Sequence, residues 1–138
     1  MTESAAVLFA NEAFYQAFAE GDAEAMEALW AEGVAVCCVH PGWNALLGRE
    51  AVIESWRAIL THPEAPPVMA FNARVQLFAP VAPLALVTCN EVIGENLLAA
   101  SNLFVHERGV WRLCHHHSGP SAEAPEVEEA EPGEGTMH

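Results

Sequence analysis

Residues 97–120 read LLAASNLFVHERGVWRLCHHHSGP, and this stretch decides the fold. Two runs that are mostly apolar, 97–107 and 110–117, flank a short turn around Gly109. A glycine-containing turn between two such runs is typical of an antiparallel β-hairpin. The sequence therefore predicts that the domain closes with two paired strands.

The segments before this hairpin predict further strands. Residues 68–77 place apolar side chains at every second position, which is typical of a half-buried strand. Residues 84–93 form another apolar run, and a turn at 94–96 joins them to the hairpin. Earlier in the chain, 34–39 have the composition of a strand buried on both faces, and the turn at 40–43 ends it.

The first half of the chain predicts three helices. Apolar residues three and four apart mark a helix over 3–20 that Gly21 ends. Asp22 is a suitable N-cap for a second helix through about Glu32, and a third helix is expected from about Gly48 to Leu60. Three helices followed by a meander of strands predict an α+β domain, with the helices on one face of a curved, mostly antiparallel sheet.

Composition limits the partners of this chain. Its 138 residues suit one domain, with 52% hydrophobic residues and a formal charge of −14. Five arginines and no lysine stand against 19 acids, so the cations that bind nucleic acid or an anionic membrane are scarce. Without a long apolar run or a leader pattern, we expect a cytoplasmic protein. We expect residues 1–120 to form the domain and 121–138 to be an acidic, disordered tail.

Three segments carry a resemblance to a known superfamily. They are FYQAFAEGD at 14–22, CVHPGW at 38–43 followed by GREAV at 48–52, and SNLF at 101–104 followed by WRLCHHHSGP at 111–120. Together they resemble the cone-shaped superfamily of nuclear transport factor two, the ketosteroid isomerases, the SnoaL-like cyclases and the calcium/calmodulin-dependent kinase association domain. The last segment is also similar to the closing strand of that association domain. The resemblance implies a six-strand sheet curved around a pocket that the first helix plugs, often in a homodimer formed through the outer sheet face.

The residues that carry isomerase chemistry in that superfamily are replaced here. Aligned on Gly21, the oxyanion tyrosine falls on Phe14, with Tyr15 next to it, and the catalytic base falls on Cys38. The second acid falls near Ser101 or Asn102. Because these groups supply the proton transfer and the oxyanion stabilisation, we expect no steroid isomerase activity.

The histidines are the most informative polar residues. On a strand, His115 and His117 point to the same side, and His40 could join them if its strand is a neighbour. Three interpretations stay open: a metal site, the polar lining of a pocket, or structural hydrogen bonding. We assign His40, His115 and His117 as candidate acid–base catalysts and expect neither a metal nor a cofactor, since the chain has no dinucleotide or phosphate-binding motif.

Other residues are candidates for ligand contact. Trp43 lies in the turn after His40, where a pocket mouth is expected, whereas the helical spacing of Trp56 also suits core packing. Amides in apolar strands need a partner, which can be the backbone or a ligand. The predicted ligand-binding residues are Tyr15, Cys38, Trp43, Trp56, Asn90 and Asn102. The four cysteines are expected to be reduced and mostly buried.

Two functional hypotheses follow. The first is a domain that binds a small apolar or amphipathic molecule in a central pocket, as an isomerase, cyclase or hydratase would. The alternative is a noncatalytic, homodimeric association module. A hollow lined by the histidines and Trp43 would favour the first, and one filled by Phe14, Phe18 and Trp56 would favour the second.

Overall fold

The computed structural model describes residues 1–123, which form three helices and one six-strand sheet. The helices are α1 (Glu3–Glu20), α2 (Ala23–Ala28) and α3 (Arg49–Leu60). The strands are β1 (Cys37–Val39), β2 (Leu46–Leu47), β3 (Val68–Leu77), β4 (Leu84–Ile93), β5 (Asn96–Glu107) and β6 (Val110–Pro120). The predicted α+β class is confirmed. The predicted acidic tail, from residue 124 on, lies outside the described residues.

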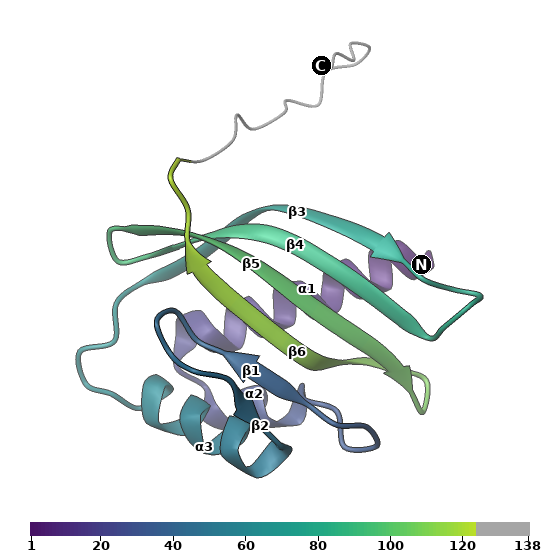
Figure 1. The fold of residues 1–138 in the computed structure, drawn as a ribbon, viewed down its shortest axis with the longest axis horizontal. Coiled ribbons are helices and arrows are strands. Elements are labelled where there is room, and N and C mark those ends of the chain that lie inside the picture. Colours follow the sequence, from purple (N-terminus) through teal and green to yellow (C-terminus); the bar gives the residue numbers. More distant parts are fainter. Residues whose placement is uncertain (124–138) are drawn as a thin grey trace.

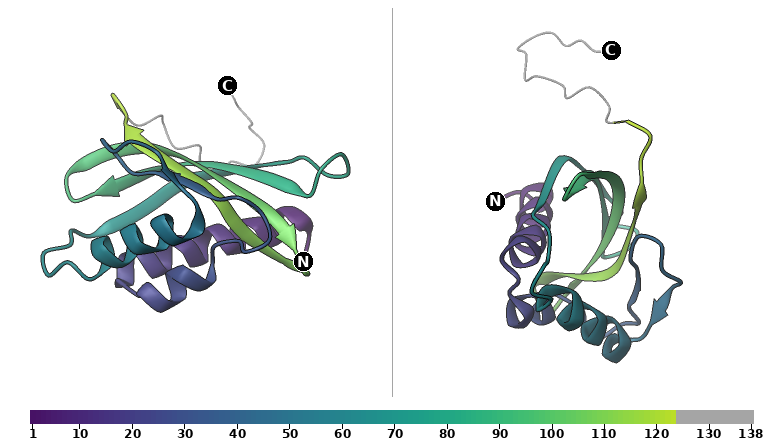
Figure 2. Two further views of the ribbon diagram at one scale, coloured as in Figure 1. Left: turned by 60° about the horizontal axis from the view of Figure 1, so that its bottom comes forward. Right: turned by 90° about the vertical axis from the view of Figure 1, so that its left-hand side faces the viewer.

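The sheet is curved and mostly antiparallel. Its strand order is β2-β1-β6-β5-β4-β3, and only β1 and β6 pair in parallel. The long strands curl over α1, and α2 and α3 lie on the same side of the sheet (Figures 1 and 2). The hydrophobic core therefore lies between the inner face of the sheet and the three helices.

Local signals position the first two helices. The Thr2 hydroxyl accepts the Ala5 N–H at 3.0 Å, and α1 ends at Gly21, whose φ of 67° lies in the left-handed region that glycine adopts without strain. The Asp22 side chain then accepts the Ala25 N–H at 3.1 Å and starts α2. Both predicted helix boundaries are confirmed.

The second helix is shorter than predicted. It ends at Ala28 because the backbone that follows pairs with β6: the Ala31 N–H donates to the Leu113 carbonyl at 2.8 Å. The Leu113 N–H donates in turn to the Leu29 carbonyl at 2.9 Å. The strand predicted at 34–39 is likewise reduced to β1, and β2 is too short to show a periodic pattern.

A β-bulge in the closing hairpin changes the direction of the histidines. Leu103 pairs with His115, but Phe104 pairs with Leu113, so Cys114 is an extra residue in β6. An extra residue shifts the alternation of side chains by one position. As a result, His116 and Ser118 follow Leu113 on the inner face of the sheet and are buried, whereas His115 and His117 point to the outer face.

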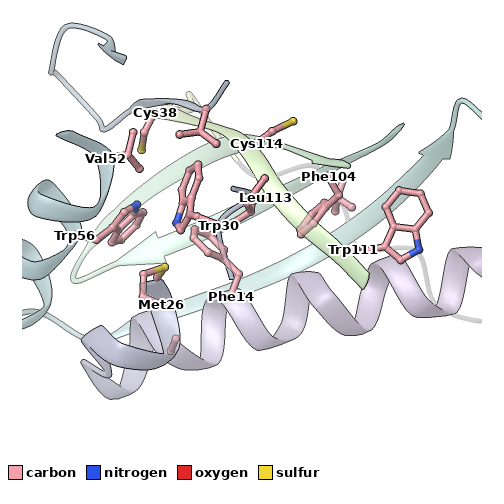
Figure 3. Close-up of a cluster of buried hydrophobic side chains, with 14 of the residues drawn as sticks. Phe14, Met26, Trp30, Cys38, Val52, Trp56, Phe104, Trp111, Leu113 and Cys114 are labelled. Atoms are coloured by element: carbon pink, nitrogen blue, oxygen red, sulfur yellow. The ribbon is translucent and has the colours of Figure 1, made fainter. Parts of the chain in front are cut away.

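Large apolar side chains fill the space between the sheet and the helices. Figure 3 shows Phe14, Met26, Trp30, Trp56 and Leu113 pointing toward one another from helices and strands. The cysteines are free, and all but Cys37 are buried, as predicted.

Candidate functional site

A pocket of about 600 Å³ opens where the end of α1, the turn after β1 and the loop between α3 and β3 meet. We call it the mouth pocket. Its wall includes Phe18, Glu20, His40, Trp43, Ile59 and Ile93. An apolar concavity with a few polar groups is the usual form of a small-molecule site.

His40 is the buried polar group in the wall of the mouth pocket. Its side chain is 3% exposed, and its Nε2 lies 2.9 Å from the Ser55 hydroxyl, which donates to the Val52 carbonyl at 2.7 Å. Because a hydroxyl has one proton, His40 must donate from Nε2, and its Nδ1 is left as the acceptor. Burial lowers the pKa of His40 to about 4, so the ring is a neutral imidazole at neutral pH.

Aromatic rings surround His40. Trp43 is 47% exposed and lies edge-on to the His40 ring, with 4.8 Å between ring centroids. Trp56 packs edge-on against the same ring, also at 4.8 Å, but it is fully buried. Cys38 lies 3.7 Å from His40 Nε2, and burial raises the pKa of this thiol to about 12. Cys38 is therefore an uncharged thiol and is unsuited to act as a nucleophile.

A second group of polar side chains lies deeper between α1 and the sheet. Glu91, on β4, is completely buried. Its carboxyl accepts hydrogen bonds from the Tyr15 hydroxyl at 2.5 Å and from the Ser118 hydroxyl at 2.6 Å. The Tyr15 oxygen accepts from the Asn102 amide at 3.2 Å and from the Cys89 thiol at 3.3 Å.

The amide of Asn102 connects this group to α1 and β6. It donates to Asn11 Oδ1 at 2.9 Å, and its own oxygen lies 2.6 Å from His116 Nδ1. Since that oxygen can only accept, His116 donates from Nδ1. We refer to Asn11, Tyr15, Glu91, Asn102, His116 and Ser118 as the buried network.

Burial changes the protonation of the buried network. It lowers the pKa of His116 to about 3 and raises the pKa of Glu91 above its usual range, against the effect of the two hydroxyl donors. Among residues 1–123, no arginine or histidine forms an ion pair with Glu91. The carboxyl is thus held by neutral hydrogen-bond donors alone.

Phe18 separates the two regions. Its ring lines the mouth pocket, stacks 6.4 Å from the Tyr15 ring and packs edge-on against Trp56 at 4.9 Å. Phe14 lies 5.5 Å from Trp56 and 5.0 Å from the His116 ring. The interior of the cone between α1 and the sheet is therefore packed with aromatic rings, and the mouth pocket lies on the other side of Phe18 and His40.

The structure separates the predicted site residues into three places. His40 and Trp43 line the mouth pocket, with Cys38 and Trp56 packed behind His40. Tyr15 and Asn102 belong to the buried network. His115, His117 and Asn90 lie on the outer face of the sheet, where the two histidine rings are 6.2 Å apart.

The prediction that His40, His115 and His117 share one hollow is therefore wrong. The bulge at Cys114 turns His116 inward instead, 6.5 Å from the His40 ring. Asn90 satisfies its amide on the outer face, where it donates to the Leu98 carbonyl at 3.2 Å.

The sequence reasoning did not identify Glu91, His116, Ser118 or Asn11. A signal for Glu91 exists, because Ala85, Val87 and Cys89 precede it at every second position of β4 and all face the core. A carboxyl in register with that apolar series is expected to be buried. No comparable signal marks His116, since its direction depends on the bulge.

Among residues 1–123, no three His, Cys, Asp or Glu side chains are placed to hold a metal ion. None of the helices in this range combines the length and hydropathy needed to cross a lipid bilayer.

The chain is similar to a known protein family and to several solved structures. Residues 7–123 match the family model of the SnoaL-like domain. A candidate dehydratase of the NTF2-like family from Streptomyces avermitilis is 32% identical, with a TM-score of 0.74, over 86% of this chain and 95% of that one. A candidate calcium/calmodulin-dependent protein kinase type II association domain from Thiobacillus denitrificans is 26% identical, with a TM-score of 0.70, over 81% and 92% of the two chains.

A curated plant protein also matches. The F-box protein SKIP8 of Arabidopsis thaliana is 25% identical over 113 residues, which cover 82% of this chain and 48% of that protein. The chain thus spans about half the length of this relative.

Proposed function

We propose that the mouth pocket of this chain, which belongs to the SnoaL-like domain family, binds a small, mainly apolar molecule. The observation that carries the proposal is a pocket of about 600 Å³ with apolar walls and one buried imidazole, His40. Burial of apolar ligand surface against Phe18, Trp43 and Ile93 supplies the affinity. His40 supplies a directed hydrogen bond.

His40 is also the group best placed for acid–base chemistry. Its neutral ring is held by Ser55 through Nε2, and Nδ1, which has the Cys38 sulfur 4.0 Å away, is the atom that would accept a proton from a bound ligand. This arrangement supports a reaction of the isomerase, cyclase or hydratase type. The 32% identity to a candidate dehydratase favours the hydratase type among these. His115 and His117 are left out of the proposal because they lie on the opposite face of the sheet.

Ligand binding is tested with the neutral apolar fluorophore N-phenyl-1-naphthylamine, whose emission rises in an apolar site. Trp43→Ala removes one pocket wall and is expected to weaken binding severalfold. Phe9→Ala is the matched control, because Phe9 is also an exposed aromatic residue but lies outside the pocket. Equal loss in both variants, or no binding by the unaltered protein, would refute the proposal.

The role of His40 is tested by imidazole NMR during the same titration. The His40 ring signals are expected to shift as the probe binds, whereas the His117 signals on the outer face serve as an internal reference and stay in place. Movement of His117 with a stationary His40 would move the site to the outer face.

A homodimeric association module is a second candidate. It is favoured by the filling of the cone interior with Phe14, Phe18 and Trp56, and by a specific surface on the outer face of the sheet. The outer residues in the middle of β4, β5 and β6 include no acid, although the chain has 19, and Glu107 lies at the far end of β5. They are Leu86, Thr88, Asn90, Val92, Leu97, Ala99, Ser101, Leu103, His115 and His117. Two copies of this acidic chain repel each other where their carboxylates meet. Contact through this face of the sheet therefore costs the least electrostatic repulsion.

Sedimentation of paired variants tests that surface. Ala99→Glu puts a carboxylate on the acid-free face, and Ala58→Glu adds the same charge on exposed α3. A dimer at high micromolar concentration that only Ala99→Glu dissociates is expected. A monomeric unaltered protein would contradict the association module.

A further inference from the structure

The lining of the mouth pocket carries negative charge. Among the described residues that line it, Glu20 is the acidic one, and neither arginine nor lysine is present. The Glu20 carboxylate is positioned by the Gln16 side-chain amide, which donates to it at 3.1 Å. His40 adds no compensating charge, because it is neutral at physiological pH.

The two arginines nearest in sequence to the pocket residues, Arg49 and Arg57, bind groups outside the mouth pocket. Arg49 donates to the Glu27 backbone carbonyl at 2.8 Å and also lies 3.8 Å from the Glu32 carboxylate. Arg57 pairs with the Glu27 carboxylate. Both contacts join α3 to the α2 region, and neither residue lines the mouth pocket. The pocket therefore keeps its negative character.

The remaining walls suit the apolar body of a cation. Trp43 is half exposed, and the negative face of an indole attracts ammonium groups. The chain as a whole carries a formal charge of −14, which raises the local concentration of cations and repels anions. Aromatic surface beside a carboxylate in an acidic protein is a combination that selects amines over neutral or acidic molecules of the same shape.

We infer that the ligand of the mouth pocket is an apolar amine, whose ammonium group lies between Glu20 and Trp43 and whose hydrocarbon body lies against Phe18, Ile59 and Ile93. This inference rests on the proposed function, since it assigns a charge class to the ligand of the same pocket. It adds Glu20 as the residue that determines specificity.

Three probes of equal shape test the inference: 1-naphthylmethylamine, 1-naphthylmethanol and 1-naphthoate, titrated into the full chain at pH 7 by calorimetry. They share one ring system and differ in charge. The amine is expected to bind at least about threefold more tightly than the alcohol, as a partly exposed ion pair allows. The naphthoate is expected to bind most weakly, and added salt should reduce the preference for the amine.

Matched variants test which residue makes the amine bind more tightly than the alcohol. Glu20→Gln is expected to remove most of the difference between amine and alcohol while leaving alcohol binding unchanged. Glu12→Gln is the control, because Glu12 is an exposed acid on the same helix and its loss changes the net charge equally. Trp43→Leu keeps apolar contact and is expected to lower amine binding about twofold to threefold more than alcohol binding.

The outcomes separate the two proposals. If none of the three probes binds, the mouth pocket itself fails as a ligand site. If the alcohol binds as tightly as the amine, the pocket stands and the amine inference is refuted. An amine preference that Glu20→Gln and Glu12→Gln reduce equally would also refute it, because the preference would then come from net charge alone.

Discussion

The mouth pocket and the buried network lie on opposite sides of Phe18 and differ in what surrounds their polar groups. In the pocket, His40 lines the wall, its Nδ1 has only the long 4.0 Å contact to the Cys38 sulfur beside it, and Trp43 is half exposed. In the network, Asn102 and Tyr15 both make hydrogen bonds to other protein side chains. This difference favours a structural role for the network and supports the proposal that the pocket binds the ligand, although both carry residues that the sequence marks as site candidates.

The largest effect on stability is expected when Asn102, at the centre of the buried network, is replaced. Asn102→Ala removes hydrogen bonds to Asn11, Tyr15 and His116; Tyr15 keeps its bond to Glu91, but the buried His116 loses the acceptor of its Nδ1 proton. We expect a loss of about 3 kcal/mol in the free energy of unfolding, measured by urea denaturation. Asn90→Ala is the matched control, with an expected loss of about 1 kcal/mol, because Asn90 lies on the outer face and bonds one backbone carbonyl and Asn72. Equal losses would contradict a central role for Asn102.

The second effect is a dependence of stability on pH that comes from His40 in the mouth pocket. Burial lowers the folded pKa of His40 to about 4, from an ordinary value of 6.5, so between these values the unfolded chain binds a proton that the folded chain does not. Stability therefore falls as the pH drops through this window and is fully present above it. At the acidic end of this window, protonation of His40 in the unfolded chain lowers the free energy of unfolding by about 3 kcal/mol.

His40→Gln tests this dependence in urea titrations at a series of pH values. The variant should lose less stability on acidification than the unaltered protein. His116 gives a dependence of the same sign in both proteins, since its pKa is about 3. Exposed His62→Gln is the control and should follow the unaltered protein. A His40→Gln curve parallel to the unaltered one would show that burial does not depress the pKa of His40.

A third, smaller effect concerns Glu91. Burial raises its folded pKa, so between the unfolded and folded values the folded chain holds the extra proton, and stability falls as the pH rises. Glu91→Gln abolishes this titration. We expect the variant to gain stability relative to the unaltered protein as the pH rises above the ordinary pKa range of a glutamate. A difference in unfolding free energy that stays constant with pH would contradict a raised pKa.

The fold was largely predictable from local chemistry, whereas the direction of the histidines was not. Gly21 and Asp22 end and start helices by interactions with their immediate neighbours, so their sequence context suffices. The direction of His116 depends on one extra residue at Cys114 in the pairing of β5 with β6, and the pattern of apolar residues does not reveal it. The contact of Glu91 with Tyr15 joins residues 76 positions apart, which no local pattern specifies.

The smallest stability effect is expected in the mouth pocket, and it is the most informative about function. Trp43 is 47% exposed and packs edge-on against His40, so Trp43→Ala removes little buried surface. We expect its free energy of unfolding to change by less than about 1 kcal/mol, while binding of the apolar fluorophore weakens severalfold. Asn102→Ala should give the opposite result when it is measured under conditions where it remains folded: a large loss of stability and near-normal binding. Were Asn102→Ala to abolish binding in the folded protein, the network would belong to the ligand site, and Phe18 would have to move aside when the ligand enters.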